Sequence, residues 1–289
     1  MAHAVTTPSE VIRSSSGRLE VHQIPAWQDN FIYLLVEKDS GSSAFIDGPE
    51  AGPALEAATR LGIRPDAIFN THTHFDHIGI NQNLSEMGRL ESMRVVGPRK
   101  AAFAVPGLTE AVDDGDSIRL GNAVGRVLLT EGHMDGHISF LFEDLLFCGD
   151  TLFAGGCGYL FDGPPAKMFE SLSKLRELDP TTKVLCAHEY TQDNLRFAFS
   201  VEPSNPDLRA RIARDWKLRA EGRSTVPSTI GLERATNPFL RWESEEIRNA
   251  VADDLPPNAG PSDVFAAIRR RKDSKKHRSI SDADLPLHG

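Results

Sequence analysis

The sequence predicts an α/β domain followed by a smaller helical domain, and two observations carry this prediction. Four apolar segments with the spacing of strands each end at a histidine or an aspartate, as happens when strand ends share one edge of a sheet. After His188 the strand-like segments cease and helical spacing follows. A chain of 289 residues is long enough for a large and a small domain. We therefore expect a first domain over residues 1–195 and a helical domain over residues 196–289.

The N-terminal half is expected to alternate between strands and helices. Residues up to about Ser16 are polar and without period, which favours a loose lead-in. Alternating apolar positions separated by turn residues predict three strands, at residues 19–24, 31–36 and 43–46. Helical spacing that stops at Gly62 predicts a helix over residues 53–61. Next we expect a strand over 67–70, a helix over 78–87 and a short strand over 93–96.

The second half is expected to begin with two hairpins and to end in helices. The predicted strands cover residues 117–120, 124–130, 138–142, 145–148 and 183–186, with an amphipathic helix over 168–178. Beyond them we expect helices over 191–200, 206–219 and 245–251, and a last helix that Ser262 and Asp263 cap. No strand is expected after His188, and the basic C-terminal tail is expected to be mobile.

One short segment concentrates the residue types that bind metals. It reads Thr71-His72-Thr73-His74-Phe75-Asp76-His77 and follows the strand predicted over 67–70. In an extended backbone residues two apart point the same way, so His72 and His74 would converge on one ion. Asp76 and His77 are neighbours that diverge, so two adjacent ions are the better prediction. Imidazole combined with carboxylate suits zinc, iron or manganese. The alternative is that these histidines serve as capping and hydrogen-bonding groups.

The charge balance bears on the class of partner. Acidic residues outnumber basic ones by 41 to 32, and the net charge is −9. This balance disfavours a nucleic-acid backbone as the main partner. Basic residues nevertheless crowd residues 269–272 and 275–278. Such a run forms either a solvated face or tail, or a local anion site, and the sequence leaves both readings open.

Cysteine usage and hydropathy bear on the compartment. The three cysteines are scattered and form no CxxC pair, so we expect a reducing compartment and no disulfide framework. The N-terminus lacks the pattern of a signal peptide, and no apolar run approaches the length of a membrane span. We expect a cytoplasmic protein without membrane association, and no feature indicates an obligatory protein partner.

The motifs resemble those of the metallo-β-lactamase superfamily, whose signature THxHxDH stands at residues 71–77. Within it the chain is most similar to the glyoxalase II, or hydroxyacylglutathione hydrolase, family, from about Leu19 to about Lys272. The further matching segments are Asp29-Asn30-Phe31-Ile32-Tyr33-Leu34, Glu131-Gly132-His133-Met134-Asp135-Gly136-His137, Gly149-Asp150-Thr151-Leu152-Phe153 with Gly156-Cys157-Gly158, and Ala187-His188-Glu189-Tyr190-Thr191. Glu131 and Asp135 depart from the family pattern. The resemblance implies a four-layer αββα fold with a smaller helical C-terminal domain.

The resemblance also implies a binuclear metal site with seven ligands. One ion would bind His72, His74 and His133, the other would bind Asp76, His77 and His188, and Asp150 would bridge the two ions. Asp76 and Asp150 are the residues expected to act in catalysis. Two zinc ions are expected, with iron or manganese as alternatives. His137 is not implied as a ligand, and a structural or supporting role is expected for it.

Four residues are expected to bind the substrate. By resemblance, Tyr190, Arg269 and Lys272 would hold glutathione, the last two through charge-assisted hydrogen bonds to a carboxylate. The alternative for them is a merely solvated basic helix end. Tyr159 stands where relatives carry a basic residue, and Phe161 keeps the aromatic residue two positions on. We expect Tyr159 to weaken the binding of the substrate.

The activity implied by the resemblance is hydrolysis of S-D-lactoylglutathione to glutathione and D-lactate, a step of methylglyoxal detoxification. A hydroxide formed at the two ions would attack the thioester carbonyl. A thiolate with a pKa of about 8.5 leaves without a dedicated general acid. No GxSxG element is present, which disfavours a covalent nucleophile. The alternatives are another hydrolase of the superfamily, acting on a different thioester or a lactone, a mononuclear iron persulfide dioxygenase, and a non-catalytic metal-binding module.

Overall fold

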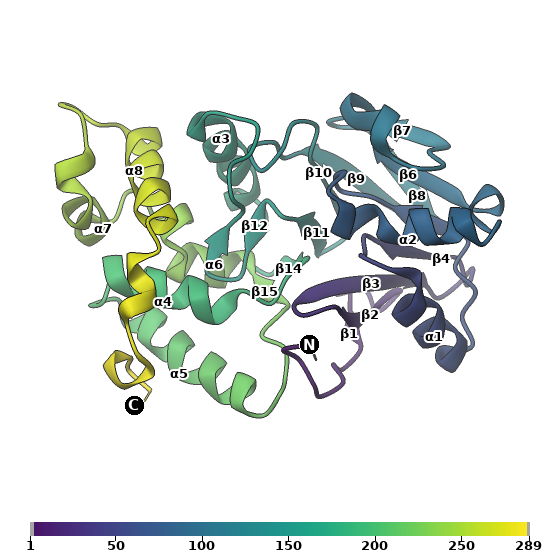
Figure 1. Cartoon of the computed structure of the whole chain (residues 1–289), viewed down its shortest axis with the longest axis horizontal. Helices are drawn as coiled ribbons and strands as arrows, with labels where there is room; N and C mark the ends of the chain where they lie inside the picture. The colour runs from purple at the N-terminus through teal and green to yellow at the C-terminus, as the bar shows by residue number, and fades with distance from the viewer. Residues whose placement is uncertain (1–2, 288–289) are drawn as a thin grey trace.

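Two β-sheets packed face to face form the centre of the molecule (Figure 1), and the computed structural model describes residues 3–287. The first sheet contains, in this order, β1 (Ile12–Arg13), β2 (Leu19–Ala26), β3 (Asn30–Glu37), β4 (Ser43–Ile46), β5 (Ala67–Phe69), β6 (Arg94–Pro98) and β7 (Glu110–Val112). Neighbouring strands are antiparallel from β1 to β4 and parallel from β4 to β7.

The second sheet is mostly antiparallel. Its order is β15 (Ser228–Thr229), β14 (Lys183–Cys186), β11 (Leu145–Gly149), β10 (Ile138–Phe142), β9 (Ala123–Leu129) and β8 (Ser117–Leu120). Only β11 and β14 pair in parallel. A separate hairpin of β12 (Leu152–Phe153) and β13 (Gly156–Cys157) follows directly after β11.

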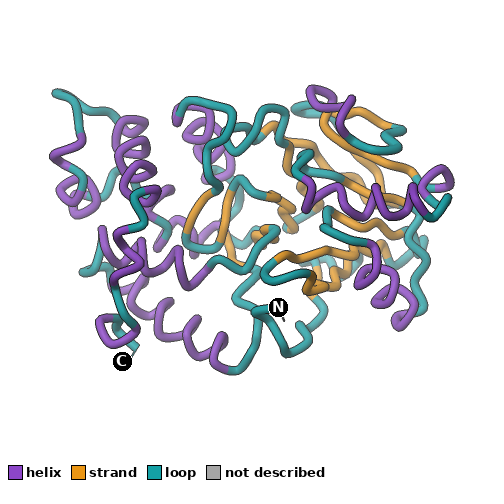
Figure 2. The backbone as a smooth tube through the Cα atoms, viewed as in Figure 1, coloured by secondary structure: helices purple, strands orange, loops and turns teal. Residues whose placement is uncertain are grey.

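Helices cover the outer faces of both sheets (Figure 2). They are α1 (Ala51–Leu61), α2 (Phe75–Glu86), α3 (Pro165–Arg176), α4 (Thr191–Val201), α5 (Pro206–Ala220), α6 (Ile230–Thr236), α7 (Glu245–Ala250) and α8 (Pro261–Asp273). Helices α1 and α2 lie over the first sheet, and α3 lies on the side of the second sheet together with the C-terminal helices. These layers confirm the αββα fold with a smaller helical part that the sequence predicts. Within residues 3–287, no helix is both long enough and apolar enough to serve as a membrane span.

Strand β3 shows why the sheets stack in this way. Successive side chains of a strand point to opposite faces, and both faces of β3 are buried. Phe31, Tyr33 and Leu35 enter the core between the sheets, whereas Ile32 and Leu34 pack against α1 and α2. An apolar run without polar alternation is therefore what a strand in this position requires.

Helix α2 begins at Phe75, three residues earlier than the sequence predicts, and His74 occupies the position that caps it. The helix lies very close to the loop after β4, because a Cβ atom on Gly79 would come within 1.8 Å of the carbonyl oxygen of Pro49. Only glycine permits this approach. The first turn of α2, which carries Asp76 and His77, is thereby fixed against the end of β4.

Both ends of the chain are more ordered than the sequence predicts. The expected loose lead-in is wrong, because β1 pairs with β2 and Val5 is buried. The absence of strands after His188 is also wrong, since β15 adds an edge to the second sheet. At the other end, Leu285 is buried against Leu195 and Trp216 rather than lying free. These contacts are made by short segments whose partners are distant in sequence, and local periodicity does not report them.

Candidate metal centre

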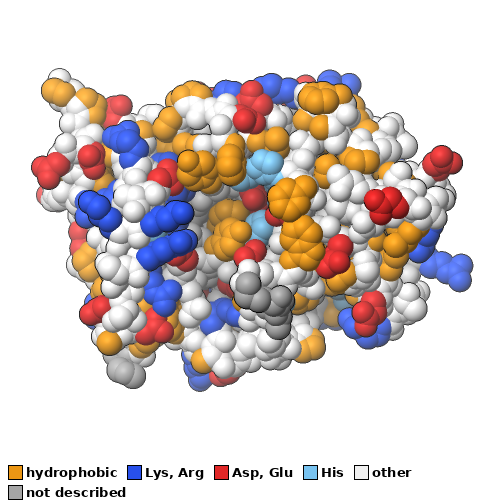
Figure 3. All heavy atoms as spheres, viewed as in Figure 1, with side chains coloured by type: hydrophobic (Ala, Val, Ile, Leu, Met, Phe, Trp, Pro, Cys, Tyr) orange, Lys and Arg blue, Asp and Glu red, His pale blue; other side chains and the backbone are white. Residues whose placement is uncertain are grey.

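The metal-binding residue types meet where strands of both sheets end. His72 and His74 follow β5, Asp76 and His77 lie in the first turn of α2, His133 follows β9, Asp150 follows β11 and His188 follows β14. Figure 3 shows histidine side chains in a hollow, with hydrophobic side chains around them and basic ones on the side of the C-terminal helices. The predicted convergence of strand ends is thus present in the structure.

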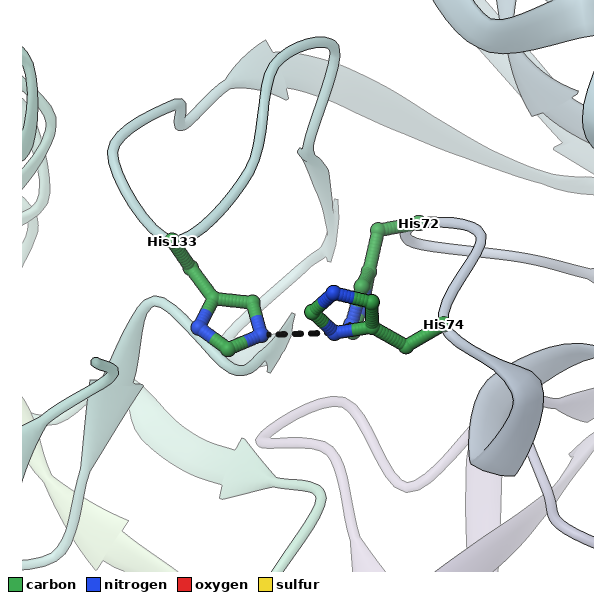
Figure 4. A group of neighbouring side chains, drawn as sticks. All are labelled: His72, His74 and His133. Atoms are coloured by element: carbon green, nitrogen blue, oxygen red, sulfur yellow. Dashed lines mark hydrogen bonds between the residues drawn. The ribbon is translucent and has the colours of Figure 1, made fainter. Parts of the chain in front are cut away.

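Three histidines form the first group, and their rings point toward one another (Figure 4). Nδ1 of His74 lies 3.2 Å from Nε2 of His72 and 2.9 Å from Nε2 of His133. The ring planes of His74 and His133 are nearly perpendicular, at 86°. Each ring thus aims a nitrogen into one small volume, which is the arrangement in which neutral imidazoles bind a divalent ion.

A carboxylate and two histidines form the second group. Oδ2 of Asp76 lies 3.4 Å from Nε2 of His188 and 3.7 Å from Nε2 of His77. His77 and His188 are almost fully buried. The seven residues named from the sequence therefore include two separate sets of converging ligand atoms, as the divergence of Asp76 and His77 suggested.

Asp150 lies between the two groups and turns one oxygen toward each. Its Oδ1 is 3.4 Å from Nε2 of both His77 and His188, and its Oδ2 is 3.4 Å from Nε2 of His133. Oδ1 of Asp150 and Nε2 of His77 are buried without a hydrogen-bond partner among the residues described. Buried polar atoms without partners are costly, and a cation between them would satisfy both. The residues present therefore fit a pair of metal ions.

The electrostatics differ between the two groups. Burial lowers the pKa of His72, His74 and His133, which keeps these imidazoles neutral and their lone pairs available. Burial opposes charge on His77 too, but the carboxylates of Asp150 and Asp47 outweigh it and raise its pKa to about 10. The second group therefore favours a positive charge at its centre, either protons or a metal ion.

Three of the expected ligands are held from behind by a second hydrogen bond. Nδ1 of His77 is 3.0 Å from Oδ2 of Asp47, and Nδ1 of His188 is 2.8 Å from Oδ1 of Asp29. Nδ1 of His133 lies 2.8 Å from the carbonyl oxygen of Tyr159. Such partners fix ring orientation and leave Nε2 for the metal. The sequence reasoning did not assign Asp29 or Asp47. Asp47 directly follows the strand predicted over 43–46, which was the available signal for it.

Asp47 also has an unusual backbone. Its φ angle is 51°, in the left-handed region that non-glycine residues rarely adopt. Its carboxylate accepts from the backbone N–H of Thr71 at 2.8 Å and from the Thr71 hydroxyl at 2.6 Å. Although Asp47 lies near His72 and His77, its oxygens are thus used in holding the segment that carries the histidines. Strained backbone of this kind is typical of functional sites.

His137 takes no part in either group. It is fully buried, its Nε2 accepts the backbone N–H of Asp150 at 3.1 Å, and its Nδ1 lies 3.1 Å from the hydroxyls of Thr130 and Thr151. The expectation that His137 supports the site rather than binding metal agrees with this geometry.

The aromatic residues expected to bind substrate lie beside the metal ligands. The ring of Tyr190 stacks on that of His188, with centroids 4.7 Å apart and planes at 4°. Burial raises the pKa of Tyr190 to about 12, so its hydroxyl stays a hydrogen-bond donor. Tyr159 is 53% exposed, and Phe161 is 60% exposed and 5.2 Å from the rings of both His74 and His133.

The two basic residues expected to bind substrate are less accessible. Arg269 is 5% exposed, donates to the carbonyl oxygen of Cys157 at 3.2 Å and pairs with Asp273. Lys272 is 8% exposed and its Nζ is 3.2 Å from Oδ2 of Asp193. The sequence suggested side chains free to bind a carboxylate, whereas in the structure both cations already have acidic partners.

Two family models match consecutive segments of the chain. Residues 39–188 match the family model described as metallo-beta-lactamase superfamily, and residues 189–275 match hydroxyacylglutathione hydrolase C-terminus. A hydroxyacylglutathione hydrolase from Methylococcus capsulatus is 49% identical over 257 residues, which cover 88% of this chain and 98% of the relative. The chain belongs to the hydroxyacylglutathione hydrolase family. A second member, from Gloeobacter violaceus, is 46% identical over 255 residues, with coverage of 88% and 98%.

Solved structures support the fold of this hydrolase of the metallo-β-lactamase superfamily. ETHE1 from Myxococcus xanthus aligns with a TM-score of 0.55 at 24% identity, covering 89% of this chain and 98% of that one. The BLEG-1 B3 metallo-beta-lactamase aligns with a TM-score of 0.57 at 23% identity, covering 76% and 99%. Identities this low speak for the shared architecture alone. The family that the sequence motifs indicate is confirmed, as are the fold and the assignment as an enzyme.

Proposed function

We propose that this enzyme hydrolyses S-D-lactoylglutathione to glutathione and D-lactate at a binuclear metal site. The observation that carries the proposal is the position of Asp150, whose two oxygens face two separate sets of ligand atoms. Membership of the hydroxyacylglutathione hydrolase family supports the thioester as substrate.

Two divalent ions held there would polarise the thioester carbonyl and lower the pKa of a water molecule. His72, His74 and His133 would hold one ion, and Asp76, His77 and His188 the other, with Asp150 between them. We propose zinc, since imidazole and carboxylate ligands suit it, and iron or manganese as the alternatives.

The protein itself contributes position and charge around the thioester. Phe161 stands edge-on to His74 and His133 and would shield that side of the carbonyl from bulk water. Tyr190 stacks on His188 and would donate its hydroxyl to the glutathione portion. A thiolate leaving group with a pKa of about 8.5 needs no protonation to depart, which agrees with the lack of a further acid among these residues.

Arg269 and Lys272 would attract the glutathione carboxylate from α8. Lys272 has two N–H donors beyond the one that faces Asp193, so a substrate carboxylate would join an existing ion pair rather than meet a free cation. Tyr159, in place of a basic residue, would add one neutral hydrogen bond at most. We therefore propose weak ground-state binding of glutathione by this chain.

A single-iron persulfide dioxygenase is the second candidate. It would leave Asp76, His77 and His188 without an ion, with Nε2 of His77 buried and unsatisfied. The purified protein should release glutathione from S-D-lactoylglutathione and contain close to two equivalents of metal. Oxygen consumption with glutathione persulfide, together with one equivalent of iron, would contradict the proposal.

The domain division and the compartment are part of the same proposal. We propose residues 1–195 as the catalytic domain and residues 196–289 as the substrate-binding domain, near the junction of the two family models at residues 188 and 189. A cytoplasmic location and a role in methylglyoxal removal would follow from the substrate, and the three cysteines are free thiols in buried positions.

A further inference from the structure

A cavity of about 580 Å³ lies at the C-terminal end of α8, away from the two metal-ligand groups. The residues that give it its character are Arg270, Arg271, Lys276, His277, Phe197 and Ile280. None of them belongs to the seven expected metal ligands or to the expected glutathione residues. Its volume lies within the range of small-molecule sites, about 300–1,000 Å³.

The segment after α8 builds one wall of this cavity. Lys275 takes a left-handed conformation, with φ of 57°, and a 3-10 helix over Lys276–Ser279 follows. Ile280 and Leu285 then pack beside Leu195, which keeps the segment in place. The match to the family's C-terminal model ends at residue 275, so this wall lies beyond the part of the chain that the model matches.

Among the residues described, Arg270, Arg271 and Lys276 have no acidic partners, in contrast to the cations on the other side of the same helix. Arg269 pairs with Asp273 and Lys272 pairs with Asp193. Arg270 and Arg271 donate only to backbone carbonyl oxygens, of Asp254 and Ala250. Among the residues described, Lys276 has no ion pair, and the one carboxylate that lines the cavity is that of Asp254. Cations at a helix C-terminus interact favourably with the helix dipole. That interaction alone does not explain why these cations surround a cavity.

His277 supplies a second and independent observation. It is 5% exposed, its Nε2 lies 3.3 Å from Oδ2 of Asp193, and its Nδ1 is buried without a partner. Buried imidazole nitrogens nearly always have a hydrogen-bond partner. A buried histidine with an unsatisfied nitrogen thus stands at the wall of the basic cavity.

We propose that this cavity binds a small organic anion. Its phosphate or carboxylate group would face Arg270, Arg271 and Lys276, where guanidinium groups offer paired N–H donors. Its apolar part would lie against Phe197 and Ile280, beside His277. The cavity volume of about 580 Å³ is large enough for a small organic molecule.

Occupancy of the cavity would reach the glutathione site through Asp193, and this step rests on the proposed function. Oδ2 of Asp193 lies 3.2 Å from Nζ of Lys272 and 3.3 Å from Nε2 of His277. A bound anion beside His277 would order its ring against Asp193, so that the imidazole takes a larger share of this carboxylate. Lys272 is released from its partner, so KM for the glutathione thioester falls while kcat is unchanged.

Calorimetry on the metal-loaded enzyme tests the site. Phenyl phosphate and isophthalate serve as phosphate and carboxylate probes at constant ionic strength, and benzyl alcohol as the neutral probe. The two anions should bind, the neutral probe should not, and Lys276→Glu should weaken the anions at least tenfold. Lys217→Glu is the matched control, because it changes the charge equally at another exposed lysine, on α5.

The possible outcomes distinguish the anion site itself from its coupling to the glutathione site. Equal anion affinity in the two charge-reversal variants would overturn the site and place the anion elsewhere, for example on the metal ions. Binding that is lost in Lys276→Glu, together with a KM for S-D-lactoylglutathione lowered about twofold or more by phenyl phosphate, supports both parts. Binding without a change in KM overturns the coupling. Absence of thioester hydrolysis would refute the proposed function, yet the calorimetric result would stand by itself.

Discussion

The backbone N–H of Asp150 donates a hydrogen bond to Nε2 of His137 at 3.1 Å. The imidazole is fully buried and its other nitrogen faces two threonine hydroxyls. Burial holds the pKa of His137 well below its ordinary value, so Nε2 acts as a neutral acceptor. One histidine thus sets the backbone position from which the carboxylate of Asp150 reaches both ligand groups.

His137→Gln and His133→Gln should therefore have different consequences. The first keeps an acceptor for the N–H of Asp150, so we expect nearly two equivalents of metal, a lowered Tm and kcat/KM within about tenfold of the parent. The second removes a ligand nitrogen, and the loss of several kcal/mol of stabilisation should lower kcat/KM by about a hundredfold or more. Metal analysis and kinetics on the same samples check this. Equal losses at equal metal content would contradict the distinction.

Asp150→Asn should empty both metal positions together. The amide keeps the size of the side chain but removes the charge that faces His77, His188 and His133. We expect metal content and turnover to fall in parallel, as measured by elemental analysis and thioester hydrolysis. Asp162→Asn makes the same charge change at an exposed position and should keep both the metal content and the turnover of the parent. Two retained equivalents with near-normal turnover in Asp150→Asn would refute the bridging role.

Lys272 should make substrate binding sensitive to alkaline pH. Burial lowers its pKa from 10.5 to about 8, against the attraction of Asp193. Below this value the ammonium is charged and attracts the glutathione carboxylate, and above it the charge is lost, so KM should rise between pH 7 and about pH 9.5. Steady-state kinetics across this range measure the effect. Lys272→Arg stays charged and should give a flatter KM profile, whereas identical profiles would exclude Lys272 as the cause.

Tyr159→Lys should improve substrate binding. The side chain of Tyr159 is exposed, and the hydrogen bond to His133 is made by its backbone carbonyl oxygen, which the substitution keeps. An ammonium offers a charge-assisted hydrogen bond of about twice the neutral strength. We expect KM for S-D-lactoylglutathione to fall several-fold with kcat nearly unchanged, and Phe103→Lys, at another exposed ring, to change neither. A KM that stays constant in Tyr159→Lys would argue against a glutathione contact at this position.

The sequence predicts which histidines and aspartates converge, because much of that information is local. A strand that ends at His72 and His74, and neighbours that diverge at Asp76 and His77, are visible within seven residues. Most strands and helices likewise follow from short-range periodicity. What local pattern does not contain is the partner behind each ligand. Asp47 lies 30 positions from His77, and Asp29 lies 159 positions from His188.

The same reason explains why the sequence does not reveal the surroundings of the cations on α8. The helix and its basic residues are evident from the sequence, but their pairing with Asp193 depends on how α4 and α8 pack. The sequence predicts that Arg269 and Lys272 bind a carboxylate but does not predict that the fold buries both side chains. The alternative of a local anion site, left open for the basic run, corresponds to the site that we propose at residues 270–277.

Strand β15 has a consequence for attempts to isolate the catalytic part. Its two residues come from beyond position 196, yet they complete the edge of the second sheet by pairing with β14. A chain cut at residue 195 would expose the backbone N–H and C=O groups of β14 along that edge, and β14 ends two residues before His188. An uncovered strand edge recruits other chains. The shortened protein should therefore aggregate on expression. In the full chain, β15 covers the edge of β14 and so prevents it from pairing with another molecule.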